Sequence, residues 1–147
     1  MTSTSAAVAT ALLASGCGGP GKLVGFVDIS SELRGYHPLR LTRDLFRTRP
    51  AFAEYLRENL PGDRVRVPPI EWANREAILV AAGPRSSTGY VLHVVDVHET
   101  PHHVVVTVHE DTPTLGEPVV ARVTYPFRLI TIPRIDKPLH LHWPGRP

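Results

Sequence analysis

Cysteine and lysine are scarce in this 147-residue sequence, and it contains no long apolar run. The single cysteine, Cys17, excludes an intrachain disulfide and any metal site built from several cysteines. No stretch reaches the roughly 18 apolar residues of a membrane-spanning helix. The sequence has 16 basic and 14 acidic residues, and it contains no basic stripe with interleaved aromatic residues. We therefore expect no binding to nucleic acid.

Proline, by contrast, is abundant. The 15 prolines are about twice the share expected from the usual ~5%. A proline inside a helix removes a hydrogen bond and clashes with the preceding turn, so long helices are disfavoured. The 42% of hydrophobic residues suffice for a packed core, and the length fits one domain.

The first twenty residues resemble a bacterial lipoprotein leader. Residues 6–14 form an apolar run of small residues, and Ser15-Gly16-Cys17 follows it. Residues 1–5 lack the usual Lys or Arg, and Ala14 stands where leucine is common. We predict that residues 1–20 are a signal and linker, and that acylated Cys17 is the only attachment to a membrane. This would place the protein in the cell envelope or otherwise outside the cytoplasm. The alternative is a leader rich in alanine and serine in which Cys17 has no role.

One convincing helix is predicted from about Pro50 to Asn59. Thr48 can cap it, Pro50 lies in its first turn, and Pro61-Gly62 ends it. Its apolar stripe, which should cover a hydrophobic core, consists of Phe52, Tyr55 and Leu56.

Most of the remaining chain alternates with a period of two, which is typical of strands. Residues 77–82 are apolar on both faces and suit a central strand. The other predicted strands cover residues 23–29, 39–41, 90–97, 103–109, 119–125, 127–132 and 139–143. The short connections cannot hold crossover helices, so the pairing should be mostly antiparallel. We predict a mainly β fold for residues 21–147 as a single domain: a small antiparallel β-sandwich or open barrel with one flanking helix.

Two motifs carry a family likeness. Gly83-Pro84-Arg85-Ser86-Ser87-Thr88-Gly89-Tyr90 follows an apolar strand, and Thr124-Tyr125-Pro126-Phe127 leads into Ile130-Thr131-Ile132-Pro133-Arg134. In this order they resemble the C-terminal domain of PrcB-type protease-complex subunits, over about residues 70–134. Thr88 replaces the first glycine of the Gly-Gly-Tyr common in that family. The resemblance implies a non-catalytic, envelope-associated protein that contacts a protein partner, such as a secreted or surface protease.

The same motifs supply the candidate site residues. The predicted interaction loop consists of Arg85, Ser86, Ser87, Thr88, Gly89 and Tyr90, and the predicted structural corner consists of Tyr125, Pro126 and Phe127. Gly89 is expected where the backbone needs a positive φ or lacks room for a Cβ. The Tyr90 ring can pack against a sheet edge while its hydroxyl stays in water. Pro126 cannot donate to a ladder, so it should mark an edge, a bend or a switch between sheets.

No residue set predicts catalysis or a bound cofactor. His93, His98, His102, His103 and His109 surround one predicted hairpin, and His140 and His142 share a strand face. A zinc site needs three or four converging ligands, and the sequence fixes no third ligand; Asp136 and Glu110 are candidates for it. No Gly-x-Ser-x-Gly elbow or phosphate-binding glycine loop occurs. We expect no metal, no cofactor, no small-molecule substrate and no enzymatic activity.

A second functional hypothesis is an inhibitor. The segment Ser86–Tyr90 also resembles the Thr-Thr-Gly-Tyr loop of chagasin-like cysteine-protease inhibitors, small all-β proteins that insert loops into a papain-type cleft. That family uses a later Arg-Pro-aromatic loop, whereas Pro126-Phe127 has no preceding arginine here.

Overall fold

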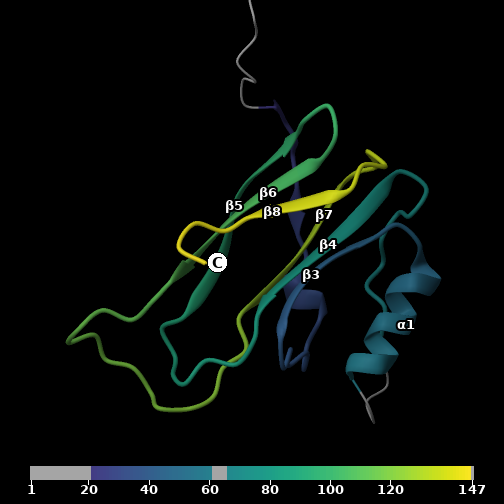
Figure 1. The fold of residues 1–147 in the computed structure, drawn as a ribbon. Coiled ribbons are helices and arrows are strands. Elements are labelled where there is room, and N and C mark those ends of the chain that lie inside the picture. The colour runs from purple at the N-terminus through teal and green to yellow at the C-terminus, as the bar shows by residue number, and fades with distance from the viewer. Residues whose placement is uncertain (1–20, 61–65, 147) are drawn as a thin grey trace, which may run out of the picture.

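The fold consists of two β-sheets and one α-helix, seen in a computed structural model that describes residues 21–60 and 66–146. One sheet, sheet A, has the strand order β1 (Lys22–Leu23), β5 (Val91–Glu99), β6 (Val104–Asp111) and β8 (Leu139–His142). The other, sheet B, has the order β2 (Val27–Asp28), β7 (Phe127–Pro133), β4 (Arg75–Ala82) and β3 (Leu41–Phe46). The helix α1 spans Arg49–Asn59, and a 3-10 turn, η1, spans Ser30–Glu32. The predicted mainly β fold is thus confirmed as an open sandwich, with no closed barrel among the described residues (Figure 1).

A hydrophobic core fills the space between the two sheets. Every second residue of β4 faces sheet A, where it meets the inward valines of β6. The fully buried contributors include Ile78, Val80, Val104, Val106 and Val108. This agrees with the predicted inward direction of the three β6 valines, which alternate with exposed or half-buried residues.

A second core lies between α1 and the outer face of sheet B. Phe52 and Leu56 of the helix are fully buried against Ala77, Leu79 and Leu129. Strand β4 is therefore buried on both faces, as its apolar run predicted. The molecule therefore has three layers, sheet A, sheet B and α1, with α1 packed on the outer face of sheet B.

The helix begins where the capping pattern predicts. The Thr48 hydroxyl accepts a hydrogen bond from the Ala51 amide at 3.3 Å, and a proline occupies the first turn. Tyr55 points toward Tyr36, and their hydroxyl oxygens lie 2.6 Å apart. Burial, followed by this hydrogen bond, raises the pKa of Tyr36 well above its ordinary value, so its hydroxyl stays neutral. No helix in the described ranges is long and apolar enough to span a membrane.

Several predicted strands differ in the structure. Residues 23–29 form two short strands in different sheets, because the chain crosses the sandwich edge between Leu23 and Val27. The strand predicted at 39–41 begins only at Leu41, after a bend at residues 39 and 40. Strand β8 pairs with β6 in parallel, because the chain visits sheet B through β7 before it returns to sheet A.

The prediction of a strand at residues 119–125 is wrong. This segment belongs to a loop, and only Thr124 forms an isolated bridge, with Arg85. Its valines are not divided into a buried and an exposed face, because Val119, Val120 and Val123 are all exposed to solvent. Pro113, Gly116 and Pro118 precede it, and the segment lies beside another loop rather than beside a strand.

Candidate interaction surface

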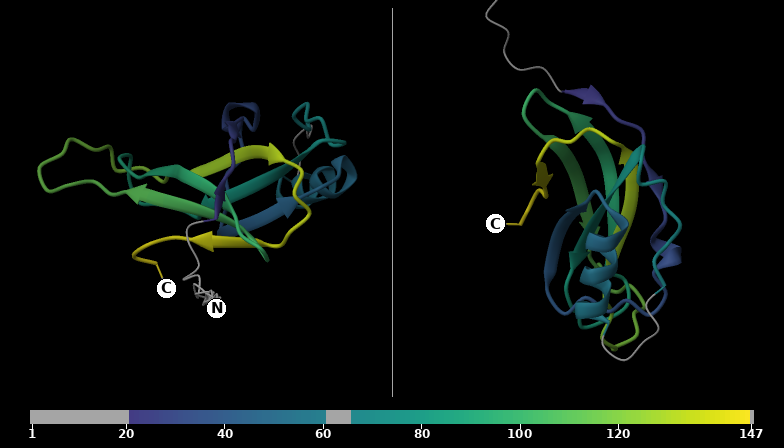
Figure 2. Two further views of the ribbon diagram at one scale, coloured as in Figure 1. Left: turned by 90° about the horizontal axis from the view of Figure 1, so that it is seen from above. Right: turned by 90° about the vertical axis from the view of Figure 1, so that its right-hand side faces the viewer.

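Two long loops meet at one end of the sandwich. The 83–90 loop connects β4 to β5, and the 112–126 loop connects β6 to β7. The second loop projects beyond the sheets in the views from the front and from above (Figures 1 and 2). The end of the sandwich formed by these two loops is called the loop end below.

Hydrogen bonds fasten the two loops to each other along their length. The Thr88 amide donates to the Val120 carbonyl at 3.0 Å, and the Val120 amide donates to the Thr88 hydroxyl at 2.9 Å. The Thr124 hydroxyl donates to the Ser87 carbonyl at 2.8 Å. The predicted interaction loop is therefore supported by a neighbouring loop rather than projecting alone.

Gly89 occupies a position that only glycine fits without strain. Its φ is +97°, in the region that L side chains rarely adopt, as the sequence predicted. A Cβ there would approach Pro113 Cγ and Val119 Cγ1 to 3.0 Å each. The close approach of the backbone to these two side chains packs the 112–126 loop against the 83–90 loop.

Arg85 is occupied inside the protein. Its guanidinium donates two hydrogen bonds to the Glu110 carboxylate, at 3.0 and 2.8 Å, and the two side chains are only 14% and 8% exposed. Glu110 also accepts from Arg146 at 3.1 Å. The Arg85 Cζ lies 5.8 Å from the centre of the Tyr90 ring. The side chain of Arg85 is therefore engaged within the protein. Ser86 is the one residue of the predicted interaction loop that is exposed.

The 112–126 loop carries four exposed apolar side chains, which are called the apolar patch below. The patch consists of Leu115, Val119, Val120 and Val123, which are 107%, 40%, 61% and 58% exposed. Clustered exposed apolar residues on a small protein mark interaction surfaces more often than isolated ones do. Sequence reasoning missed this patch because it assigned the valines to a strand. The Pro and Gly residues between 113 and 118 were the signal that could have indicated a loop.

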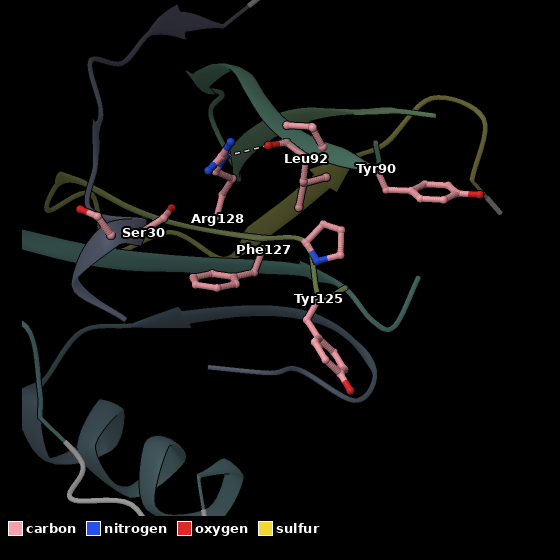
Figure 3. Close-up of a pocket in the computed structure, with 9 residues that line it drawn as sticks. Ser30, Tyr90, Leu92, Tyr125, Phe127 and Arg128 are labelled. Carbon is pink, nitrogen blue, oxygen red and sulfur yellow. Dashed lines mark hydrogen bonds between the residues drawn. The ribbon is translucent and has the colours of Figure 1, made fainter. Parts of the chain in front are cut away.

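Tyr90 of the predicted loop and all three residues of the predicted corner line one surface hollow of about 420 Å³ (Figure 3). Tyr90 and Leu92 line one side of it, and Tyr125 and Phe127 line the other; Pro126 also lines the hollow. The Arg128 guanidinium, also in its wall, donates to the Leu92 carbonyl at 2.7 Å and so links β7 to β5 across the two sheets. The Tyr90 ring points away from the hollow in Figure 3.

The corner residues lie directly before β7 and at its first position, and they contact neighbouring elements. The Pro126 carbonyl accepts from the Ala82 amide at 2.9 Å, directly before β7 begins, so Pro126 lies at the strand start where proline is tolerated. Tyr125 stacks on His37 with a distance of 4.8 Å between the ring centroids. The rings of Phe127 and Tyr36 are T-shaped, with their centroids 5.0 Å apart. These contacts hold Tyr125 and Phe127 against aromatic rings of the segment that precedes β3.

The histidines lie mainly on the outer face of sheet A. Asp111 lies between two of them, with Oδ2 2.8 Å from His93 Nε2 and Oδ1 3.2 Å from His109 Nε2. The rings of His103 and His140 are 6.1 Å apart. Within residues 21–60 and 66–146, no three His, Cys, Asp or Glu side chains are arranged to hold a metal ion. Cys17 lies outside the described residues.

The fold and the loop end define the class: a small β-sandwich with a flanking helix and a surface built from two joined loops. Residues 77–133 match the family model described as PrcB C-terminal. The matched residues run from within β4 to the end of β7, and the match confirms the resemblance inferred from the loop and corner motifs. No curated protein and no solved structure matches the chain.

Proposed function

We propose that this protein is a non-catalytic, exported β-domain that acts by binding another protein through its loop end, as an accessory subunit of a secreted or surface protease. The observation that carries the proposal is the exposed patch of Leu115, Val119, Val120 and Val123, presented on a loop that is hydrogen-bonded to its neighbour. A preorganised loop pair loses little conformational freedom on binding, which favours affinity. The match to the PrcB C-terminal family model supports a role in a protease complex.

The segment that begins at Gly21, after Cys17, enters the sandwich at the end opposite the loop end, which is compatible with a tether at one end and a binding surface at the other. Lys22 of β1 pairs with Glu99 at one end of β5, whereas Gly89 and Val91 lie at the other end, in or beside the 83–90 loop. The nine residues of β5 span roughly 30 Å at about 3.4 Å per residue. An acyl anchor at Cys17 would therefore attach the end of the sandwich opposite the loop end, and the apolar patch would face away from the membrane.

An ion pair fastens the end that would carry the tether. Lys137 Nζ donates to the Glu99 carboxylate at 2.7 Å and to the Thr100 carbonyl at 2.8 Å. The hydrogen bond from Lys137 holds the pKa of Glu99 below its ordinary value of 4.5. The segment before β8 is thereby attached to the turn between β5 and β6.

Cys17→Ala is expected to move the native full-length protein from the membrane fraction to the soluble fraction of the cells that make it. One acyl chain binds a membrane only marginally, so the several chains of a bacterial lipoprotein are required for stable anchoring. Cell fractionation followed by mass spectrometry of the peptide containing Cys17 measures both effects. Wild-type protein in the cytosol with an unmodified Cys17 would contradict the anchoring proposal.

The double variant Leu115→Ser/Val120→Ser is expected to lose at least about tenfold in binding to the partner protein. Both side chains are exposed, so their loss removes apolar contact area without opening the core. The measurement is quantitative mass spectrometry of proteins crosslinked to the tagged chain in its native envelope, with the partner's affinity then measured on purified components. The matched control is Val95→Ser, a similarly exposed valine (56%) in the middle of β5.

Equal enrichment of every protein by the wild type and the patch variant would contradict the proposed surface. Nanomolar inhibition of a papain-type protease, lost on Gly89→Trp, would instead favour the inhibitor hypothesis for the segment Ser86–Tyr90. The hydrogen bonds between this segment and Val120 and Thr124 support the binding proposal, because a loop joined to its neighbour is less suited to insert alone into a narrow cleft.

A further inference from the structure

The four edge strands of the sandwich are not equally protected. Strands β1 and β2 are two residues long, and the four-residue β8 lies between Pro138 and Pro144. Such short or proline-flanked edges resist pairing with another chain. Strand β3 is six residues long, pairs on one side only, and contains neither a proline nor a bulge. A surface hollow beside it is lined by Arg40–Asp44 alone.

The two faces of β3 are distinct. Leu41, Arg43 and Leu45 are paired with β4 residues that face the core between the sheets. Thr42, Asp44 and Phe46 are on the face that carries α1, and Arg40 lies at the bend directly before the strand, with its backbone beside Gly83. Arg40 is exposed and Asp44 half-buried, and neither forms an ion pair among the described residues.

Of the three registers centred on Thr42, Arg43 and Asp44, one makes this pattern complementary to itself. When two β3 strands pair antiparallel in a continuous sheet, residues on the same face must lie opposite each other. A two-fold axis at Arg43 would place two Arg43 side chains opposite each other, and an axis at Asp44 would do the same for two Asp44 side chains. An axis at Thr42, with the ladder extended by one residue beyond the start of β3, instead places Arg40 of each copy opposite Asp44 of the other, with the two Thr42 residues paired at the centre. Opposite charges and Thr–Thr pairs stabilise such ladders, whereas like charges destabilise them.

We propose that the edge of β3 is a homodimer interface at which two copies of this chain join their B sheets, with Thr42 on the two-fold axis and two Arg40–Asp44 ion pairs. The inference goes beyond the proposed function and does not rest on it. The pairing reverses one sandwich relative to the other, so the two Gly21 ends point in opposite directions.

Charge reversal tests the register directly. Arg40→Glu places a second carboxylate opposite Asp44, and Asp44→Arg places a second guanidinium opposite Arg40, so each single variant should remain monomeric. An equimolar mixture of the two variants allows a heterodimer with two oppositely charged pairs. One pair is the native Arg40–Asp44 pair, and in the other the two charges have exchanged positions. We expect the wild type and the mixture to approach twice 16.2 kDa in analytical ultracentrifugation at about 10 to 500 µM, the range of a small, weak interface. The full-length, unacylated chain is used with a reducing agent, which prevents linkage through Cys17.

In the heterodimer, each variant contributes one altered and one native charge to the ladder. The side chain introduced by Arg40→Glu lies opposite the one introduced by Asp44→Arg, and the native Asp44 of the first variant lies opposite the native Arg40 of the second. Both pairs are therefore of opposite sign, whereas each variant paired with itself holds two pairs of like sign. Dimers should form in the mixture and in neither variant alone.

The control is Lys22→Glu, the same charge change on the short edge strand β1, which should dimerise like the wild type. Circular dichroism establishes that each variant is folded. A monomeric wild type at about 500 µM would overturn the proposal, as would dimers in both single variants or a mixture that stays monomeric. These outcomes are separate from loss of partner binding at the apolar patch, which leaves the β3 edge unchanged.

Discussion

Phe52→Ala is expected to lower the free energy of unfolding by about 3–5 kcal/mol, the usual cost of removing a buried aromatic ring. Phe52 is fully buried in the core beneath α1, with its ring 4.9 Å from Phe46 and 6.0 Å from Trp72. The cavity cannot collapse easily because sheet B on the other side of this core is itself packed on both faces. Urea unfolding followed by tryptophan fluorescence and by far-UV circular dichroism measures the loss.

The control for Phe52→Ala is Glu54→Ala, an exposed position on the same helix, which should change stability by less than about 0.5 kcal/mol. A loss below about 1 kcal/mol for Phe52→Ala would mean that α1 is not packed on sheet B as described. The three-layer arrangement would then be wrong, although the sandwich could remain.

Glu110→Gln is expected to cost about 2–4 kcal/mol, because one carboxylate with little solvent exposure serves two arginines. Its partners are Arg85, which holds the 83–90 loop, and Arg146, whose guanidinium lies 4.7 Å from the centre of the Trp143 ring. The neutral amide keeps the shape of the side chain but loses the charge that pairs with both guanidiniums. The effect should therefore reach the loop end as well as the global stability.

Urea unfolding measures the stability lost in Glu110→Gln, and hydrogen exchange at the Thr88 and Thr124 amides reports on the loop end. Both amides donate to the opposite loop or its bridge partner, so they should exchange faster when the Arg85 anchor weakens. Glu58→Gln, an exposed position on α1, serves as the control. Unchanged exchange together with a stability loss under about 0.5 kcal/mol would show that solvent already screens the ion pairs.

The sequence predicted much of the fold because its signals are local. The apolar run at 77–82, the alternation at 103–109 and the capping of α1 by Thr48 each depend on a few neighbouring residues. The positive φ at Gly89 was predictable for the same reason, since it follows from the turn chemistry around that glycine. The family likeness rested on motifs of this local kind and matches residues 77–133.

Other features depend on which distant segments meet. The alternating valines at 119–123 fit a strand by pattern, and only the absence of a neighbouring strand in the described part of the chain makes them a loop with an exposed patch. Arg85 looks like a free side chain in the sequence, but Glu110 on another strand occupies its guanidinium. The fully buried Glu76, which accepts hydrogen bonds from Arg47 and from the Ile135 amide, likewise could not be anticipated from its neighbours.

The sequence by itself determined that this chain forms a small β-rich domain with one capped helix and a PrcB-like loop and corner. Local backbone preference and side-chain alternation are sufficient for those features. The tertiary structure alone decided that β8 returns parallel to β6, that β3 is the long open edge, and that the two loops join into one surface. Strand order and edge exposure arise from contacts between residues far apart in the chain, and no local pattern encodes them.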